Sequence, residues 1–169
     1  MMDPEQIIGF FGMRPLPREG GYYVETYRCK QKLAQAPPLA GRVGERSLCT
    51  AILYLLTPDT FSALHRLRSD EIFHFYLGDP VIMLQLHPDR STELITLGPD
   101  ILNGQRVQVK VPKNSWQGCF LNEGGRFALM GTTVAPGFEH ADFEPADTEE
   151  LLEQYRDRKD LILKLTRRE

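Results

Sequence analysis

The chain has 169 residues, of which 41% are hydrophobic and 25% charged, as is ordinary for one globular domain. Its formal net charge of −3 disfavours a nucleic-acid surface, because such a surface needs a basic stripe. The three cysteines lack disulfide or metal-site spacing, and no apolar run reaches the roughly 18 residues of a membrane span. The N-terminus has no basic region typical of a signal peptide. These features predict a cytoplasmic protein without a nucleic-acid or membrane partner.

Residues 1–18 predict a short helix followed by a loop. Asp3 is suited to cap the helix, Pro4 fits its first position, and Gln6 completes a capping box. Gly12 is suited to end the helix. Its apolar face would consist of Ile7, Ile8, Phe10 and Phe11.

Short runs with the period of a β-strand follow, separated by Pro- and Gly-containing turns. The longest connection is marked by Pro37, Pro38, Gly41 and Gly44. So many short strands predict an antiparallel sandwich or barrel, with a jelly roll as the favoured form. The runs are 22–28, 48–57, 71–77, 81–87, 93–97, 106–111, 117–122 and 126–134.

The C-terminal segment returns to a helical pattern. Asp147 and Glu150 form a second capping box, and a buried stripe would follow from Leu151, Leu152 and Tyr155. We therefore expect one domain over residues 1–169, with helix and loop over 1–18, the β-structure over 19–146 and helical structure over 147–169.

Residues 62–78 hold the densest cluster of ionisable and aromatic side chains, which predicts the active or binding site. Strict strand alternation places Glu71, Phe73 and Phe75 on one face. His74 and Tyr76 then lie on the other face.

His65, Glu71 and Gly78 match the first motif of the cupins: His-x-His, three or four residues, Glu, six residues, Gly. Residues 112–117 are a weaker match to the second motif, Pro-x-Gly-x-x-His. The chain resembles still more closely a small family of uncharacterised cupins, which share segments like EGGYYxETYR, SAxHRxxSDEIWHFYxG, VPxxxWQ and VAPGF. Here these segments are residues 19–28, 62–78, 111–117 and 134–138.

This resemblance implies an all-β double-stranded β-helix, the cupin jelly-roll barrel, with short helices at both ends. It also implies a homodimer similar to the rhamnose-pathway sugar-nucleotide epimerases. Two positions depart from the general cupin pattern. Leu67 replaces the second histidine and Gln117 the last one, whereas a cupin metal centre uses three histidines and one glutamate. We therefore predict no cofactor and no metal at the standard site.

In the cupin pattern the motif glutamate points into the barrel, so Phe73 and Phe75 would line an apolar pocket around Glu71. Such surroundings raise a carboxyl pKa and suit a general acid or base. His65 would remove a proton next to a carbonyl, and Glu71 or Tyr76 would return a proton or stabilise the enolate. His74 and Tyr76 would face outward unless a bulge re-aims them, and for His74 a catalytic and a structural role stay equally open.

Three further residues are candidates for ligand binding. Trp116 and Gln117 would offer an aromatic wall beside an amide, which suits a sugar or a nucleobase, although the core is the more common place for a tryptophan. Glu25 would reach the barrel mouth, or else form a surface ion pair with Arg28.

The sequence thus predicts a cupin that binds a small molecule. The favoured hypothesis is a metal-independent sugar or sugar-nucleotide epimerase or isomerase that acts by proton transfer. One alternative is a non-catalytic module that binds a metabolite in the same pocket. The other is a metal-dependent cupin enzyme that recruits an extra ligand from His74 or water.

Overall fold

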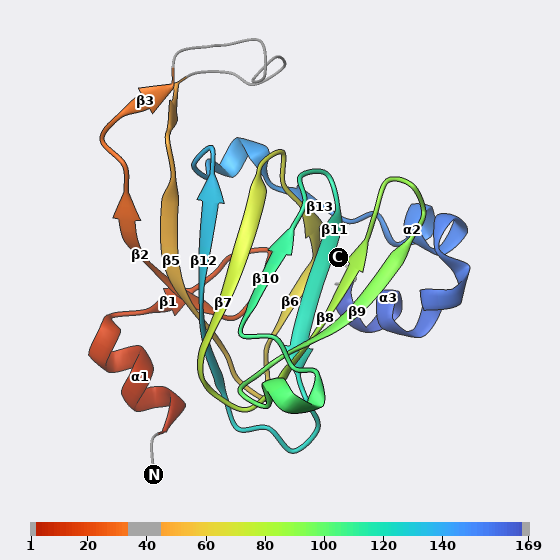
Figure 1. Cartoon of the computed structure of the whole chain (residues 1–169), viewed down its shortest axis with the longest axis horizontal. Helices are drawn as coiled ribbons and strands as arrows, with labels where there is room; N and C mark the ends of the chain where they lie inside the picture. The colour runs from red at the N-terminus through yellow and green to blue at the C-terminus, as the bar shows by residue number, and fades with distance from the viewer. Residues whose placement is uncertain (1–2, 34–44, 167–169) are drawn as a thin grey trace.

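The computed structural model describes residues 3–33 and 45–166, and two antiparallel sheets dominate it (Figure 1). The predicted connection at Pro37, Pro38, Gly41 and Gly44 lies outside the described residues, as do residues 167–169 of the predicted C-terminal segment. A two-stranded sheet, β3 (Lys32–Leu33) with β4 (Arg46–Ser47), stands at one end of the molecule (Figure 1).

The first large sheet carries half of the residues that line the candidate functional site. Neighbouring strands in it are mostly distant in the chain, because the polypeptide crosses between the sheets as a jelly roll does. In spatial order its strands are β1 (Arg14–Pro15), β2 (Tyr22–Arg28), β5 (Thr50–Leu56), β12 (Ala128–Ala135), β7 (Asp70–Gly78) and β10 (Gln108–Val111).

The second sheet faces the first across the core. In spatial order its strands are β13 (Glu144–Pro145), β6 (Phe61–Arg66), β11 (Trp116–Leu121), β8 (Val81–Leu86) and β9 (Thr92–Leu97). The sheets confirm the predicted all-β jelly roll. Strand β6 departs from the sequence prediction, which gives no strand between the runs 48–57 and 71–77. Its central residues are buried, so it has no polar alternation that would mark it as a strand.

Apolar side chains fill the space between the sheets. Tyr54, Phe73 and Met83 are all but inaccessible to solvent there, and Phe75 is 8% exposed. Burying each such side chain contributes on the order of 2 kcal/mol, so this cluster holds the two sheets together.

Helix α1 (Pro4–Phe11) covers part of the outer face of the first sheet (Figure 1). The capping box of Asp3 and Gln6 is present, and Gly12 ends the helix in a left-handed conformation, as predicted. Only Ile7 of the predicted apolar face is buried. Phe10 and Phe11 are 84% and 39% exposed, because the helix rests on the sheet along one narrow side.

Two short C-terminal helices cover the outer face of the second sheet. They are α2 (Thr148–Gln154), capped by Asp147 through a 2.9 Å bond from the Glu150 amide, and α3 (Lys159–Leu165). Leu151 and Tyr155 pack there against Trp116, whereas Leu152 is half-buried. Short 3-10 turns occur at Ile101–Asn103, His140–Asp142 and Arg156–Arg158. Within the described residues, no helix has the length and apolar character needed to span a membrane.

Strand β7 shows the alternation that its sequence predicts. Glu71, Phe73 and Phe75 are buried and face inward, while Tyr76 is 53% exposed. The register between β7 and β12 shifts beside Tyr76. Gly78 ends the strand at φ +107°, and a Cβ there would collide with the Phe127 carbonyl, which is a physical reason for glycine at this motif position.

Candidate functional site

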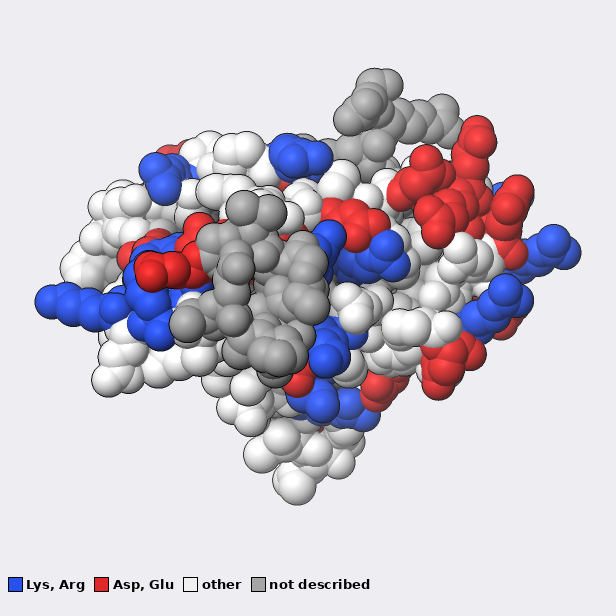
Figure 2. Space-filling view, turned by 90° about the horizontal axis from the view of Figure 1, so that it is seen from above, with Lys and Arg blue, Asp and Glu red and all other residues white. Residues whose placement is uncertain are grey.

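A cavity of about 310 Å³ opens at one end of the barrel. Its walls come from the loop between β1 and β2, from strands β2, β5, β7 and β12, and from residues 138–143. Apolar side chains such as Ile52, Tyr54 and Leu67 line it together with several charged groups. On the face of the molecule in Figure 2, basic and acidic side chains are interspersed, so charge is not of one sign there.

His65, Glu71 and Gln117 meet at the base of this cavity, and each is buried. The Nδ1 of His65 lies 2.7 Å from the Ala63 carbonyl oxygen. Because a carbonyl only accepts, Nδ1 carries a hydrogen, and in a neutral imidazole this makes Nε2 the acceptor. The Gln117 amide nitrogen donates to this Nε2 at 2.9 Å and to Glu71 Oε2 at 3.0 Å. One amide thus joins a base and a carboxyl group.

The Glu71 carboxyl has an unusual affinity for its proton. Burial raises its pKa from the ordinary 4.5 to about 7, and the nearby Glu19 carboxylate also raises it. His65 and the hydrogen bonds from Thr132 and Gln117 oppose this shift. Glu71 is therefore close to half-protonated at neutral pH, which is the condition in which a group can both accept and donate protons.

A second carboxyl group, that of Glu19, also lies near Nε2 of His65. Its Oε2 is 3.8 Å from His65 Nε2, and its Oε1 accepts a 2.9 Å bond from the Ser62 hydroxyl. The ring of Phe143 stacks on that of His65 at 4.9 Å. Burial raises the pKa of Tyr54 well above its usual value, so its hydroxyl keeps its proton and donates to the Gly20 carbonyl at 2.8 Å.

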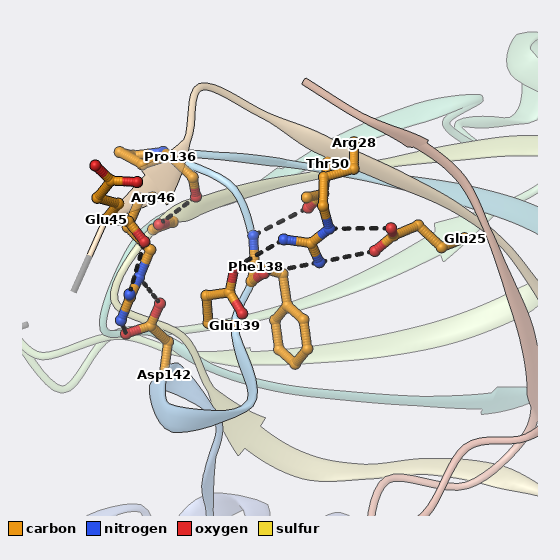
Figure 3. A network of polar contacts seen from close by, with 10 residues as sticks. Glu25, Arg28, Glu45, Arg46, Thr50, Pro136, Phe138, Glu139 and Asp142 are labelled. Carbon is orange, nitrogen blue, oxygen red and sulfur yellow. Dashed lines mark hydrogen bonds and ion pairs between the residues drawn. The ribbon is translucent and has the colours of Figure 1, made fainter. Parts of the chain in front are cut away.

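Arg28 organises the charged groups on another wall of the cavity (Figure 3). It donates to both oxygens of Glu25, at 3.0 and 2.8 Å, and to Glu139 at 2.8 Å. Beside this network, the guanidinium of Arg46 contacts Asp142 at 3.1 and 3.3 Å, and both side chains are about 95% buried (Figure 3). The segment that carries Phe138 and Phe143 to the cavity is therefore fixed by ion pairs at two points.

The residues at the cupin metal position do not fit a metal centre. Leu67 lines the cavity without a donor atom, and Gln117 presents its amide nitrogen, not its oxygen, to His65 and Glu71. Gln117 Oε1 is buried without a hydrogen-bond partner among the described residues. No cluster of three or more His, Cys, Asp or Glu in residues 3–33 and 45–166 has a geometry for metal ions.

The structure brings together only some of the residues that the sequence singled out. Glu25, His65 and Glu71 line the cavity, and Gln117 contacts the last two. Phe73 and Phe75 share the face of Glu71 but lie farther along the barrel, so they belong to the core and do not line the cavity.

Trp116, His74 and Tyr76 lie elsewhere. Trp116 is 3% exposed and packs under the C-terminal helices, with Arg66 4.3 Å from its ring, because its side chain points to the opposite face of β11 from Gln117. His74 and Tyr76 stand on the outer face of β7, where His74 is within 3.3 Å of Thr133 and 3.2 Å of Gln108. The register shift at Tyr76 does not turn it into the cavity.

Sequence reasoning missed several lining residues, among them Arg18, Glu19, Tyr54 and Phe143. Glu19 begins the segment EGGYY, whose density of glycine and charge was a usable signal. Phe143 had no such signal in the sequence. It reaches His65 only because the following strand, β13, pairs with β6.

The antiparallel jelly roll is an architecture that cupins share with other protein families. The match over residues 5–146 to the family described as Cupin superfamily (DUF985) shows that this chain belongs to that family. The chain is 30% identical over 133 residues to the uncharacterized protein YML079W of Saccharomyces cerevisiae, a match that covers 74% of this chain and 66% of the yeast protein.

Two solved structures are similar over essentially their whole length. Protein SO0799 from Shewanella oneidensis is 33% identical with a TM-score of 0.86, and the match covers 100% of both chains. A hypothetical protein from Leishmania major is 27% identical with a TM-score of 0.87, covering 99% of this chain and 100% of the other. Membership in this superfamily supports a cupin that binds a small molecule.

Proposed function

We propose that the chain is a metal-independent isomerase or epimerase that moves a proton on a sugar-like carbonyl substrate. The observation that carries this proposal is the contact of Glu71 and His65 with one amide of Gln117 at the base of the cavity. Two proton-transfer groups beside each other, both buried at the base of a cavity, suit general acid–base catalysis. The cupin centre has no metal-ligand set here, so the protein's own side chains are assigned the chemistry.

In this proposal Glu71 takes the proton from the carbon next to the carbonyl, and the C–H electron pair forms an enediolate. Glu71 then returns the proton to the neighbouring carbon. His65 Nε2 accepts the substrate's hydroxyl proton and passes it to the former carbonyl oxygen, so protons and electrons balance. Both groups contact the same amide and therefore face the substrate from one side. This favours an aldose–ketose isomerase over an epimerase with bases on opposite faces.

The test is exchange of solvent deuterium, followed by proton NMR. Aldoses, ketoses, their phosphates, sugar acids and sugar nucleotides are each incubated with the protein in D₂O above neutral pH. We expect deuterium at the carbon next to the carbonyl in at least one compound, and its loss in Glu71→Gln. Glu93→Gln is the control, since Glu93 is exposed and pairs with Arg106 outside the cavity. No exchange in any compound would refute the proposal.

One observation favours the alternative, a binding module without catalysis. Both ring nitrogens of His65 are occupied by protein groups, Nδ1 by Ala63 and Nε2 by Gln117. A substrate hydroxyl must displace the Gln117 donor before His65 can act. Calorimetric titration with the same compounds separates the two functions, because the binding module predicts one compound that binds tightly without exchanging deuterium.

A further inference from the structure

We propose that Arg14 and Arg18 hold an anionic group at the cavity mouth, so that the ligand is a small metabolite carrying a carboxylate or a phosphate. This inference concerns the class of ligand that the same cavity takes. It rests on the proposed function only where the ligand is called a substrate. The binding of the anion stands on separate observations.

The first observation is the absence of a carboxylate partner. Arg14 and Arg18 both line the cavity, and within residues 3–33 and 45–166 neither forms an ion pair. Other described arginines do pair with acidic groups, namely Arg28, Arg46, Arg66, Arg106 and Arg126. The two guanidinium groups at the cavity therefore keep their charge available to a ligand.

The second observation is that aromatic rings orient both guanidinium groups. Arg14 lies 5.0 Å from the centre of the Tyr23 ring, and Arg18 lies 5.5 Å from that of Phe143. A stacked guanidinium keeps the N–H groups along its edge free, and these match a carboxylate or phosphate bidentately. The ring of Phe143 also stacks on His65, so the anion site and the base of the cavity share one wall.

The third observation is the backbone of Arg18. This residue has φ +68°, a left-handed conformation that is uncommon for any residue except glycine. It sits in a turn closed by bonds from Gly20 to Leu16 at 2.9 Å and from Leu16 to Gly21 at 3.0 Å. Backbone of this kind is concentrated at ligand sites, where the position of a side chain matters more than local stability.

The acidic groups of the cavity are already engaged. Arg28 binds both oxygens of Glu25 and one of Glu139, and Ser62 donates to Glu19. They do not neutralise Arg14 and Arg18 by direct contact. The volume of about 310 Å³ is near the lower end of the range for ligand pockets, roughly 300 Å³, and fits a molecule of monosaccharide size.

Calorimetric titration with four probes tests the inference: inorganic phosphate, glucose, glucose 6-phosphate and glucuronate. We expect at least one sugar anion to bind about tenfold or more tightly than glucose, because glucose has no charged group that could accept hydrogen bonds from the two guanidinium groups. The preference disappears in the Arg14→Gln/Arg18→Gln variant and persists in the control Arg106→Gln, whose guanidinium pairs with Glu93. Comparing glucose 6-phosphate with glucuronate tells phosphate from carboxylate.

The inference is overturned if no probe binds at about 10 mM, if glucose binds as well as the anions, or if the double variant keeps the preference. Should the double variant fail to melt cooperatively, the single Arg14→Gln variant, altered at an exposed position, replaces it. Glu71→Gln is expected to keep anion binding. Anion binding without deuterium exchange would thus refute the proposed function alone, and exchange without anion preference would refute only this inference.

Discussion

Gln117 donates a 3.0 Å hydrogen bond from its amide nitrogen to Oε2 of Glu71, between strands that belong to opposite sheets. In the general cupin pattern this position carries the last histidine ligand. An amide N–H cannot coordinate a metal, but it can stabilise a carboxylate while leaving that group free to take up a proton. Gln117 and Leu67 together therefore separate this site from the metal-based form of the same barrel.

The free energy of unfolding should decrease as the pH rises, because of Glu71. Its pKa is about 7 in the folded protein and 4.5 ordinarily, so the folded state binds more protons in the interval between them. The stabilising contribution of Glu71 is complete below pH 4.5 and is lost as the pH rises through about 7. The loss in the free energy of unfolding is on the order of 3 kcal/mol. Urea unfolding of wild type and Glu71→Gln from pH 4 to 8 measures this difference. Parallel pH profiles would contradict it.

Restoring the two missing histidines should create a metal site. Leu67 lines the cavity, and Gln117 is within 2.9 Å of His65 Nε2, so Leu67→His/Gln117→His adds imidazoles next to His65 and Glu71. After loading with Ni²⁺ or Zn²⁺ and desalting, elemental mass spectrometry should find about one metal per chain in the double variant and far less in wild type. Stoichiometric metal in wild type that disappears in His65→Ala would contradict the donor analysis.

The buried pair of Arg46 and Asp142 should matter far more than an exposed pair. Arg46→Met removes both buried hydrogen bonds from this guanidinium to the Asp142 carboxylate, which should cost about 3 kcal/mol in the free energy of unfolding. Arg46→Met/Asp142→Leu should recover most of this loss. The control Arg106→Met breaks a pair that is about half-exposed and should cost about 1 kcal/mol or less. Denaturant unfolding checks all three, and equal costs for both single variants would be the contrary result.

Tyr76 and His74 should be dispensable at the cavity. Tyr76 packs over Gly131 on the outer face of the first sheet, and His74 lies beside it with the rings 6.3 Å apart. Tyr76→Phe and His74→Gln should therefore leave deuterium exchange and ligand affinity within about twofold of wild type, as surface changes generally do. A tenfold loss in either assay would assign them a role that this geometry does not provide.

Local patterns predicted the parts of the fold that local physics determines. Asp3, Pro4 and Gln6 fix the first helix through backbone bonds within one turn, and alternation along β7 assigns its two faces. The sequence did not reveal which side of a helix or strand is covered by other parts of the chain. Phe10 looked buried but is exposed, and Trp116 packs under helices instead of lining the cavity.

The candidate site was only partly predictable for the same reason. His65 and Glu71 lie within a single motif, so spacing alone brought them together. Arg18 and Phe143 contact each other across 125 positions of sequence, a relationship set by the strand order and not by any nearby pattern. The predicted homodimer depends on contacts between chains, and it stays a prediction.

The most direct test is a titration of the Glu71 carboxyl itself. In protein labelled with ¹³C at the glutamate side-chain carboxyl, the resonance absent from Glu71→Gln belongs to Glu71, and its shift is followed from pH 3 to 9. We expect a midpoint near pH 7, well above the ordinary 4.5. A midpoint near 4.5 would show a carboxylate that is fully ionised at neutral pH, and it would contradict the assignment of Glu71 as the proton-transfer group.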